Sequence, residues 1–168
     1  MNKNTKLGTL FIVATPIGNL NDISSRALET LSRVDICAAE DTRKSRILFN
    51  RYQIKTRLVS YHKYSEDKKL DYFISKLKSG KDVALVSDAG TPLISDPGYL
   101  LVKKARQLLI KVIPIPGSSS LTAAISVSGL PINRFTFYGF LTRKIKAKRE
   151  LINFIANDIN TSVVFESG

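Results

Sequence analysis

The sequence has little sulfur and histidine and no tryptophan: its 168 residues include one cysteine, one methionine and one histidine. Because the lone Cys37 cannot form a disulfide within the chain, we expect a reducing compartment, the cytoplasm. One histidine and one cysteine supply too few of the ligands that zinc prefers, so we expect no metal site.

Long apolar runs are also missing. None approaches the about 20 residues that cross a bilayer, and the short apolar run after Leu7 leads straight into a polar loop. We therefore expect no signal peptide and no membrane partner.

The glycine motifs that bind phosphates are absent as well. The sequence contains neither G-x-G-x-x-G, typical of dinucleotide sites, nor G-x-x-x-x-G-K-[ST], typical of nucleoside triphosphate sites. The loop after the first apolar segment, Thr15-Pro-Ile-Gly-Asn19, has a single glycine and is a poor pyrophosphate cradle. A small-molecule ligand of this chain should therefore carry no phosphate.

Acidic residues are scarce relative to basic ones. The chain has 14 Asp and Glu against 26 Lys and Arg, which gives a formal net charge of +12 and a pI near 9.9. Such an excess favours a polyanionic partner, because neutralising phosphates releases their counterions. The alternative is that part of the excess reflects an AT-biased genome, since the chain is also rich in Ile and Asn.

Apolar strand segments alternate with helical patterns along most of the chain. The strand segments are residues 10–14, 34–39, 57–61, 82–86 and 112–115, and the helical patterns cover 24–33, 41–49, 65–77, 99–109 and 121–127. Strands that are apolar along their whole length are typical of a parallel sheet covered on both faces. We expect an α/β fold with a five-stranded parallel sheet and helices on both faces.

The pattern changes after Pro131. An aromatic strand at residues 134–140, a helix at 142–157 and a strand from 162 follow. We expect a first domain at residues 1–131 and the beginning of a second, incomplete α/β domain at 132–168, since so few elements cannot bury a core. This reading predicts a chain that is truncated at its C-terminus.

Three loops rich in small and hydroxyl residues follow predicted strands. They are Thr15–Asn19, Ser87–Gly98 and Pro116–Ser120. Right-handed crossovers place the carboxyl ends of parallel strands at one edge of the sheet, where ligands of open α/β sheets bind. We expect a small-molecule cleft at this edge, with Asp88 as a fixed charge for a ribose hydroxyl or an ammonium group.

Five segments together resemble the ribosomal RNA small subunit methyltransferase I family, which has the tetrapyrrole methylase-like fold. The segments are VATPIGNLNDIS from Val13, AAEDTRKS from Ala38, SDAGTPLISDPGYLLV from Ser87, PIPGSSSLTAAISVSGLP from Pro114 and VVFES from Val163. The resemblance implies two α/β domains with S-adenosyl-L-methionine between them. It also implies 2′-O-methylation of a cytidine ribose in the decoding region of small-subunit ribosomal RNA, with that RNA or the assembled small subunit as partner and a homodimer at full length.

The resemblance also assigns cofactor-binding residues to the three loops and to the last strand. They are Thr15 and Pro16, then Asp88, Ala89, Gly90 and Thr91, then Ser119 and Ser120, and finally Phe165. The chain departs from the family where P-G-P-S-A is replaced by Pro116-Gly-Ser-Ser-Ser120 and where F-Y-E-S-P-H-R stops after Glu166-Ser167.

The sequence identifies no catalytic base. A ribose hydroxyl is a poor nucleophile while protonated, so a base would help. The candidates Glu40, Asp41 and His62 follow predicted strands, but the acids can equally be a helix N-terminus favoured by the dipole, and His62 a surface histidine.

Two basic clusters are candidates for binding RNA. The first comprises Arg43, Lys44 and Arg46; the second comprises Arg143, Lys144, Lys146, Lys148 and Arg149. Clustered like charges cost stability unless an anion is near. The clusters can therefore be interpreted as contacts to RNA phosphates or as solvent-exposed helix faces.

Three functions are therefore open. The first is an S-adenosylmethionine-dependent ribose methyltransferase of ribosomal RNA. The second is a tetrapyrrole-pathway methylase of the same fold. The third is a truncated, inactive remnant that binds RNA or a partner protein.

Overall fold

The computed structural model of the chain describes residues 6–166. The chain forms two compact units, divided between Ser119 and Ser120. The second unit therefore includes residues 120–131, which the sequence analysis assigned to the first domain. The domain boundary expected after Pro131 stays a prediction.

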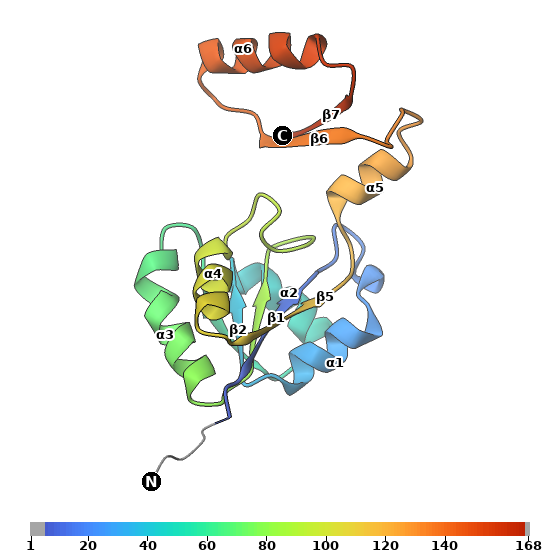
Figure 1. Ribbon diagram of the computed structural model, residues 1–168. Coiled ribbons are helices and arrows are strands. Elements are labelled where there is room, and N and C mark those ends of the chain that lie inside the picture. The colour runs from blue at the N-terminus through green and yellow to red at the C-terminus, as the bar shows by residue number, and fades with distance from the viewer. Residues whose placement is uncertain (1–5, 167–168) are drawn as a thin grey trace. The chain divides into compact units, whose positions relative to one another are not determined.

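The first unit contains the expected five-stranded parallel sheet. Its strands are β1 (Thr9–Val13), β2 (Ile36–Ala39), β3 (Arg57–Ser60), β4 (Val83–Val86) and β5 (Lys111–Ile115), in the spatial order β3-β2-β4-β1-β5 (Figure 1). Every neighbouring pair is parallel, with Phe11 opposite both Ala84 of β4 and Ile113 of β5. The predicted fold class is confirmed, and the strand bounds agree within two residues.

Helices cover both faces of this sheet. They are α1 (Ser25–Arg33), α2 (Thr42–Arg51), α3 (Glu66–Lys78) and α4 (Tyr99–Gln107), with a short 3₁₀ helix, η1, at Leu20–Asp22. Figure 1 shows α1 and α2 on one side of the strands and α3 and α4 on the other. Each crossover thus returns the chain to the same edge, where the loops after the strands gather.

Two cores result from the alternation of side chains along the strands. Phe11, Cys37 and Val86 point to the core beneath α1 and α2, together with Leu31 and Phe49. Their strand neighbours Leu10, Ala38 and Leu85 point to the core beneath α3 and α4, together with Phe73 and Leu101. Because both faces are covered, strands β2 and β4 are buried at every residue.

The second unit contains helix α5 (Ser120–Ser126), strand β6 (Phe135–Phe140), helix α6 (Ile145–Ala156) and strand β7 (Thr161–Phe165). Strands β6 and β7 form a parallel pair, and the ring of Phe165 lies 4.8 Å from Phe137 and 5.4 Å from Phe140. Helix α6 begins three residues later than position 142, where the sequence predicted its start. None of the described residues 120–166 is fully buried, so this unit has an aromatic cluster but no closed core.

The helices of residues 6–166 are all too short or too polar to span a membrane. In the same range, no three His, Cys, Asp or Glu side chains gather as a metal site would require.

Candidate functional site

The first and second predicted loops are joined directly. Thr15 and Gly90 form an isolated antiparallel bridge, in which each backbone N–H donates to the carbonyl of the other at 2.9 Å. The Thr15 hydroxyl also donates to the Ser87 carbonyl at 3.2 Å. Gly90 has φ of +81°, a conformation that a side chain disfavours. The bridge therefore explains why this loop carries a glycine at position 90.

The third loop contacts the second loop and the residue just before the first. The Thr91 hydroxyl donates to the Ser118 carbonyl at 3.1 Å. A Cβ atom on Gly117 would lie 3.0 Å from Cβ of Ala14, so the third loop packs closely on the end of β1. The three loops that the sequence placed at one edge thus form a single connected wall.

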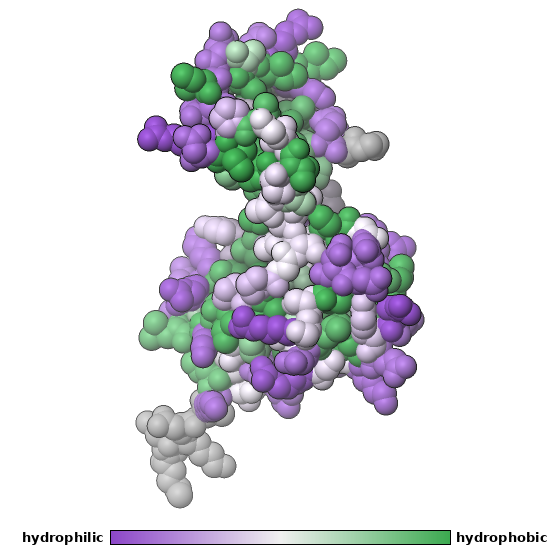
Figure 2. Space-filling view, turned by 90° about the vertical axis from the view of Figure 1, so that its right-hand side faces the viewer, coloured by the Kyte–Doolittle hydropathy of each residue, from purple (hydrophilic) through white to green (hydrophobic). Residues whose placement is uncertain are grey.

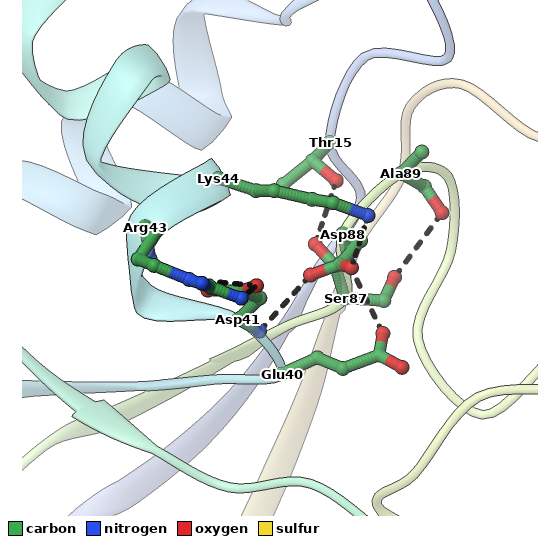
Figure 3. Close-up of polar contacts among 8 residues, drawn as sticks. All are labelled: Thr15, Glu40, Asp41, Arg43, Lys44, Ser87, Asp88 and Ala89. Atoms are coloured by element: carbon green, nitrogen blue, oxygen red, sulfur yellow. Dashed lines mark hydrogen bonds and ion pairs between the residues drawn. The ribbon is translucent and has the colours of Figure 1, made fainter.

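Asp88 ties this wall to the start of α2 (Figure 3). Its two carboxylate oxygens accept hydrogen bonds from the backbone N–H of Asp41 at 3.0 Å and from Nζ of Lys44 at 2.8 Å. Its own N–H donates to Oε2 of Glu40 at 3.2 Å. Asp88 follows β4 at the expected edge of the sheet, but the sequence offered no sign of these partners. A carboxylate has about four acceptor positions, so this one still has acceptor capacity for a ligand.

A pocket of about 230 Å³ opens beside Asp88. Its polar residues include Thr15, Ser87 and Lys44, and its apolar wall comes from Val86 and from Leu48 and Phe49 of α2. Pro16, also expected at the site, lines this Asp88 pocket too. The sequence offered no signal for the apolar wall, because the spacing of Leu48 and Phe49 is that of any core-facing helix.

The candidate bases Glu40, Asp41 and His62 line a second, wider hollow of about 490 Å³. Burial raises the pKa of Glu40, and the nearby carboxylates of Asp88 and Asp96 raise it further against the hydrogen bond from the Asp88 N–H. Burial likewise raises the pKa of Asp96. Glu40 therefore holds a proton more readily than an exposed glutamate.

Asp41 differs from Glu40 in its surroundings. Hydrogen bonds from the side chain and backbone of Arg43 hold the pKa of Asp41 at about 2, below its ordinary value. Its Oδ1 accepts from the Arg43 N–H at 2.8 Å, which makes Asp41 the N-cap of α2. The alternative that Asp41 marks the N-terminus of a helix is therefore confirmed.

The first basic cluster lies on α2. Arg43 and Arg46 are exposed, and Arg43 pairs with Asp41 at 2.8 Å. Lys44 pairs with Asp88 at the same distance, although its side chain is 63% exposed. Two of the three cations are thus partly neutralised, and one of them, Lys44, holds the loop wall to the helix.

The second basic cluster lies on and before α6 in the second unit. Arg143 and Lys144 precede the helix, Lys146 and Arg149 are exposed on it, and Lys148 pairs with Glu166 at 3.2 Å. Their role in binding RNA stays a prediction.

The remaining predicted cofactor residues lie at the division and beyond it. Ser119 ends the first unit and Ser120 begins α5, while Ala89 is exposed next to the bridge. Phe165 packs in the aromatic cluster of the second unit. Ser167, the last residue of the VVFES segment, lies outside the described residues.

Relatives of known name support the resemblance seen in the motifs. The chain is 50% identical to ribosomal RNA small subunit methyltransferase I of Buchnera aphidicola over 99% of its length, 51% identical to that of Pseudomonas aeruginosa over 95%, and 47% identical to that of Escherichia coli O157:H7 over 95%. The chain spans 59%, 57% and 56% of these relatives. The resemblance inferred from the five segments is therefore confirmed.

A solved structure shows the same fold at much lower identity. The uroporphyrin-III-C-methyltransferase of Thermus thermophilus superposes with a TM-score of 0.60 at 20% identity, over 79% of this chain and 60% of that one. Residues 9–168 match the family described as Tetrapyrrole (Corrin/Porphyrin) Methylases. With nearly its whole length matched, the chain belongs to the tetrapyrrole methylase family.

Proposed function

We propose that the chain acts in the S-adenosylmethionine-dependent 2′-O-methylation of a cytidine ribose in the decoding region of small-subunit ribosomal RNA. The observation that carries this proposal is the identity of 47–51% to relatives named ribosomal RNA small subunit methyltransferase I. The net charge of +12 is consistent with an RNA partner. The proposed substrate is ribosomal RNA or the assembled small subunit, in the cytoplasm, and a homodimer stays part of the proposal.

The connected loops fit the proposed cofactor. S-adenosylmethionine has an ammonium, a carboxylate, ribose hydroxyls and an adenine but no phosphate. Asp88 offers acceptors, Thr15 and Thr91 offer hydroxyls, and the Asp88 pocket has an apolar wall. We assign cofactor binding to Thr15, Pro16, Asp88, Ala89, Gly90, Thr91, Ser119, Ser120 and Phe165.

When bound, the cofactor supplies an electrophilic methyl group on a sulfonium. The contribution of the chain is positioning: the Thr15–Gly90 bridge and the Asp88 contacts fix the loop wall against α2 before any ligand arrives. Among the acids, Glu40 suits proton removal better than Asp41, because its pKa is raised toward neutrality while that of Asp41 is about 2.

A transfer assay tests the proposal. Unmodified small subunits and S-adenosylmethionine would be incubated with the chain extended by the residues that follow in the Buchnera relative, since the chain spans 59% of it. Nucleoside mass spectrometry should detect 2′-O-methylcytidine. Methylation only of a tetrapyrrole would favour the second hypothesis, and a methyl group on a base would overturn the ribose assignment.

A further inference from the structure

The hollow that contains the candidate bases is separate from the Asp88 pocket. It lies at the carboxyl ends of β2 and β3, between the start of α2 and the turn before α3. Its volume of about 490 Å³ falls in the range of ligand sites. Besides the candidate bases, its lining includes Arg43, Lys63 and Tyr64. We call it the His62 hollow.

The turn of residues 61–65 presents an aromatic ring to solvent. The Tyr64 side chain is 90% exposed, which is unusual for so large a ring, and it lies 6.3 Å from the His62 ring in an edge-to-face arrangement. The turn itself is held in place: the Ser65 N–H donates to the His62 carbonyl at 2.8 Å, and the Ser65 hydroxyl lies 3.1 Å from the His62 N–H. Tyr64 is thus carried by a hydrogen-bonded turn, and its ring is open to solvent.

One residue that lines the hollow, His62, has a buried polar atom without a hydrogen-bond partner within residues 6–166. Nδ1 of His62 is buried and has no hydrogen-bond partner among the described residues. A buried polar group without a partner costs free energy, so the His62 side chain is not in its best-satisfied arrangement in this structure.

The charges of the hollow are arranged for an anionic ligand with polar edges. Lys63 is exposed at the rim, and the Arg43 guanidinium lies over the Asp41 carboxylate with contacts of 2.8–3.3 Å, so it screens that acid. Glu40 is tied inward to the Asp88 N–H. A phosphate beside Lys63 and Arg43 therefore meets cations, while the partly buried Glu40 offers an acceptor to an N–H group.

We infer that the His62 hollow is a subsite for one nucleotide of single-stranded RNA, with its base on the Tyr64 ring and its phosphate beside Lys63 and Arg43. Aromatic rings bind unpaired bases by stacking, and an exposed ring next to cations is the arrangement that such sites use. The inference rests on the proposed function, since it assumes an RNA substrate. It adds a second binding site at the same sheet edge as the cofactor loops.

The lack of tryptophan in the chain makes a direct test possible. In Tyr64→Trp, the only indole stands at the proposed stacking position. Binding of a single-stranded oligoribonucleotide from the small-subunit decoding region should quench its fluorescence saturably. Leu109→Trp is the matched control: Leu109 is 89% exposed, like Tyr64, but follows α4 next to the start of β5, at the opposite edge of the sheet. Its fluorescence should not change.

Affinities complete the test. Tyr64→Ala should weaken RNA binding about tenfold, by the usual contribution of one stacked base, whereas Tyr64→Phe should bind like the parent. Lys63→Gln should lower the slope of log affinity against log salt concentration by about 0.7, the contribution of one phosphate of a single strand. The charge-matched Lys104→Gln should leave this slope unchanged. Affinity for S-adenosylmethionine should be unchanged in all four.

The outcomes separate the two proposals. Equal RNA affinity and salt slope in parent, Tyr64→Ala and Lys63→Gln would overturn the subsite while leaving the RNA substrate standing. A parent that binds no RNA would overturn both. Quenching of Leu109→Trp as strongly as Tyr64→Trp would show that RNA coats the surface without using the hollow.

Discussion

Gly90 is the residue whose backbone the loop wall depends on most. At φ of +81° it forms the bridge to Thr15, and a side chain there costs about 1–2 kcal/mol. We expect Gly90→Ala to lose stability by about this amount and to weaken cofactor binding, because the strain is relieved by breaking the bridge. Chemical denaturation and calorimetric titration with S-adenosylmethionine would measure the two effects.

Gly80 is the control for that experiment. Its φ of +84° is nearly the same, but it follows α3, far from the loops, beside the carbonyl of Lys6. Gly80→Ala should therefore lose stability and keep its cofactor affinity. If both variants lose affinity equally, the loss comes from reduced stability, and the bridge has no special part in binding.

Asp41 gives a pH dependence with a defined sign. Its pKa in the folded chain is lowered to about 2, against about 3.9 when unfolded. The contribution of the ionised Asp41 carboxylate to the free energy of unfolding is therefore fully present above pH about 4 and is lost as the pH falls through about 2. Asn caps helices as well as Asp does, so Asp41→Asn removes only the charge.

We accordingly expect the stability difference between parent and Asp41→Asn to be constant from neutral pH to about 4 and to vanish near 2. Urea denaturation at several pH values would show it. A difference that grew as the pH fell would contradict the assigned interaction with Arg43.

At the residue scale, the sequence predicted where single residues lie in the fold better than which side chains they contact. It placed Asp88 in the loop wall but gave no sign of Lys44, because that pair joins residues 44 apart. Ser65 stands at the N-cap position of α3, but its side chain makes no capping hydrogen bond. Ser65 has φ of −114° and ψ of −2°, whereas a capping residue needs an extended backbone; its hydroxyl bonds His62 instead. Helix α4 is capped by Glu66, whose Oε1 accepts from Gly98 and Leu100.

At the scale of elements, the strands and helices of the first unit could be predicted almost completely. Parallel strands covered on both faces are apolar along their length, so β2 and β4 are evident in the sequence. The start of α6 could not be predicted as well. Lys144 caps it without a side-chain hydrogen bond, so the sequence contains no capping signal there.

Helix α6 carries the prediction for RNA binding at this scale. Replacing Lys144 and Lys146 by Gln should lower the log–log salt slope of RNA affinity by about 0.7 for each single-strand phosphate that they contact. Lys148 should contribute less, since it already pairs with Glu166. The charge-matched change of Lys103 and Lys104 on α4 is the control. Equal salt slopes in the parent and in the α6 variant would show that these lysines face solvent and do not contact RNA phosphates.

At the scale of the molecule, the two units differ in how well they bury apolar surface. The first has two cores, whereas the second leaves Phe140 55%, Phe154 64% and Ile159 99% exposed. Figure 2 shows hydrophobic residues open on the surface of the second unit. Exposed patches of this kind promote association, so the chain should self-associate at high concentration through this unit.

Sedimentation velocity tests this prediction. Phe154→Ser with Ile159→Asn should reduce self-association, whereas Ile47→Ser with Leu109→Asn should not, although those residues of the first unit are 62% and 89% exposed. Monomeric parent protein at all concentrations would contradict it. The sequence predicted an incomplete second domain after Pro131, because two strands and one helix cannot enclose a core, and that domain assignment stays a prediction.

The most direct test of the whole account is a calorimetric titration of S-adenosylmethionine into the chain and into Asp88→Ala and Asp35→Ala. Asp35 is a matched control: like Asp88 it accepts one bond from a lysine, Lys81 at 2.8 Å, and one from a backbone N–H, but it precedes β2 at the opposite edge of the sheet. The account predicts saturable binding to the parent, about tenfold weaker binding to Asp88→Ala, as expected for the loss of a charged partner, and unchanged binding to Asp35→Ala. No binding to the parent, or equal affinity in all three proteins, would contradict the assignment of the cofactor to the loop wall.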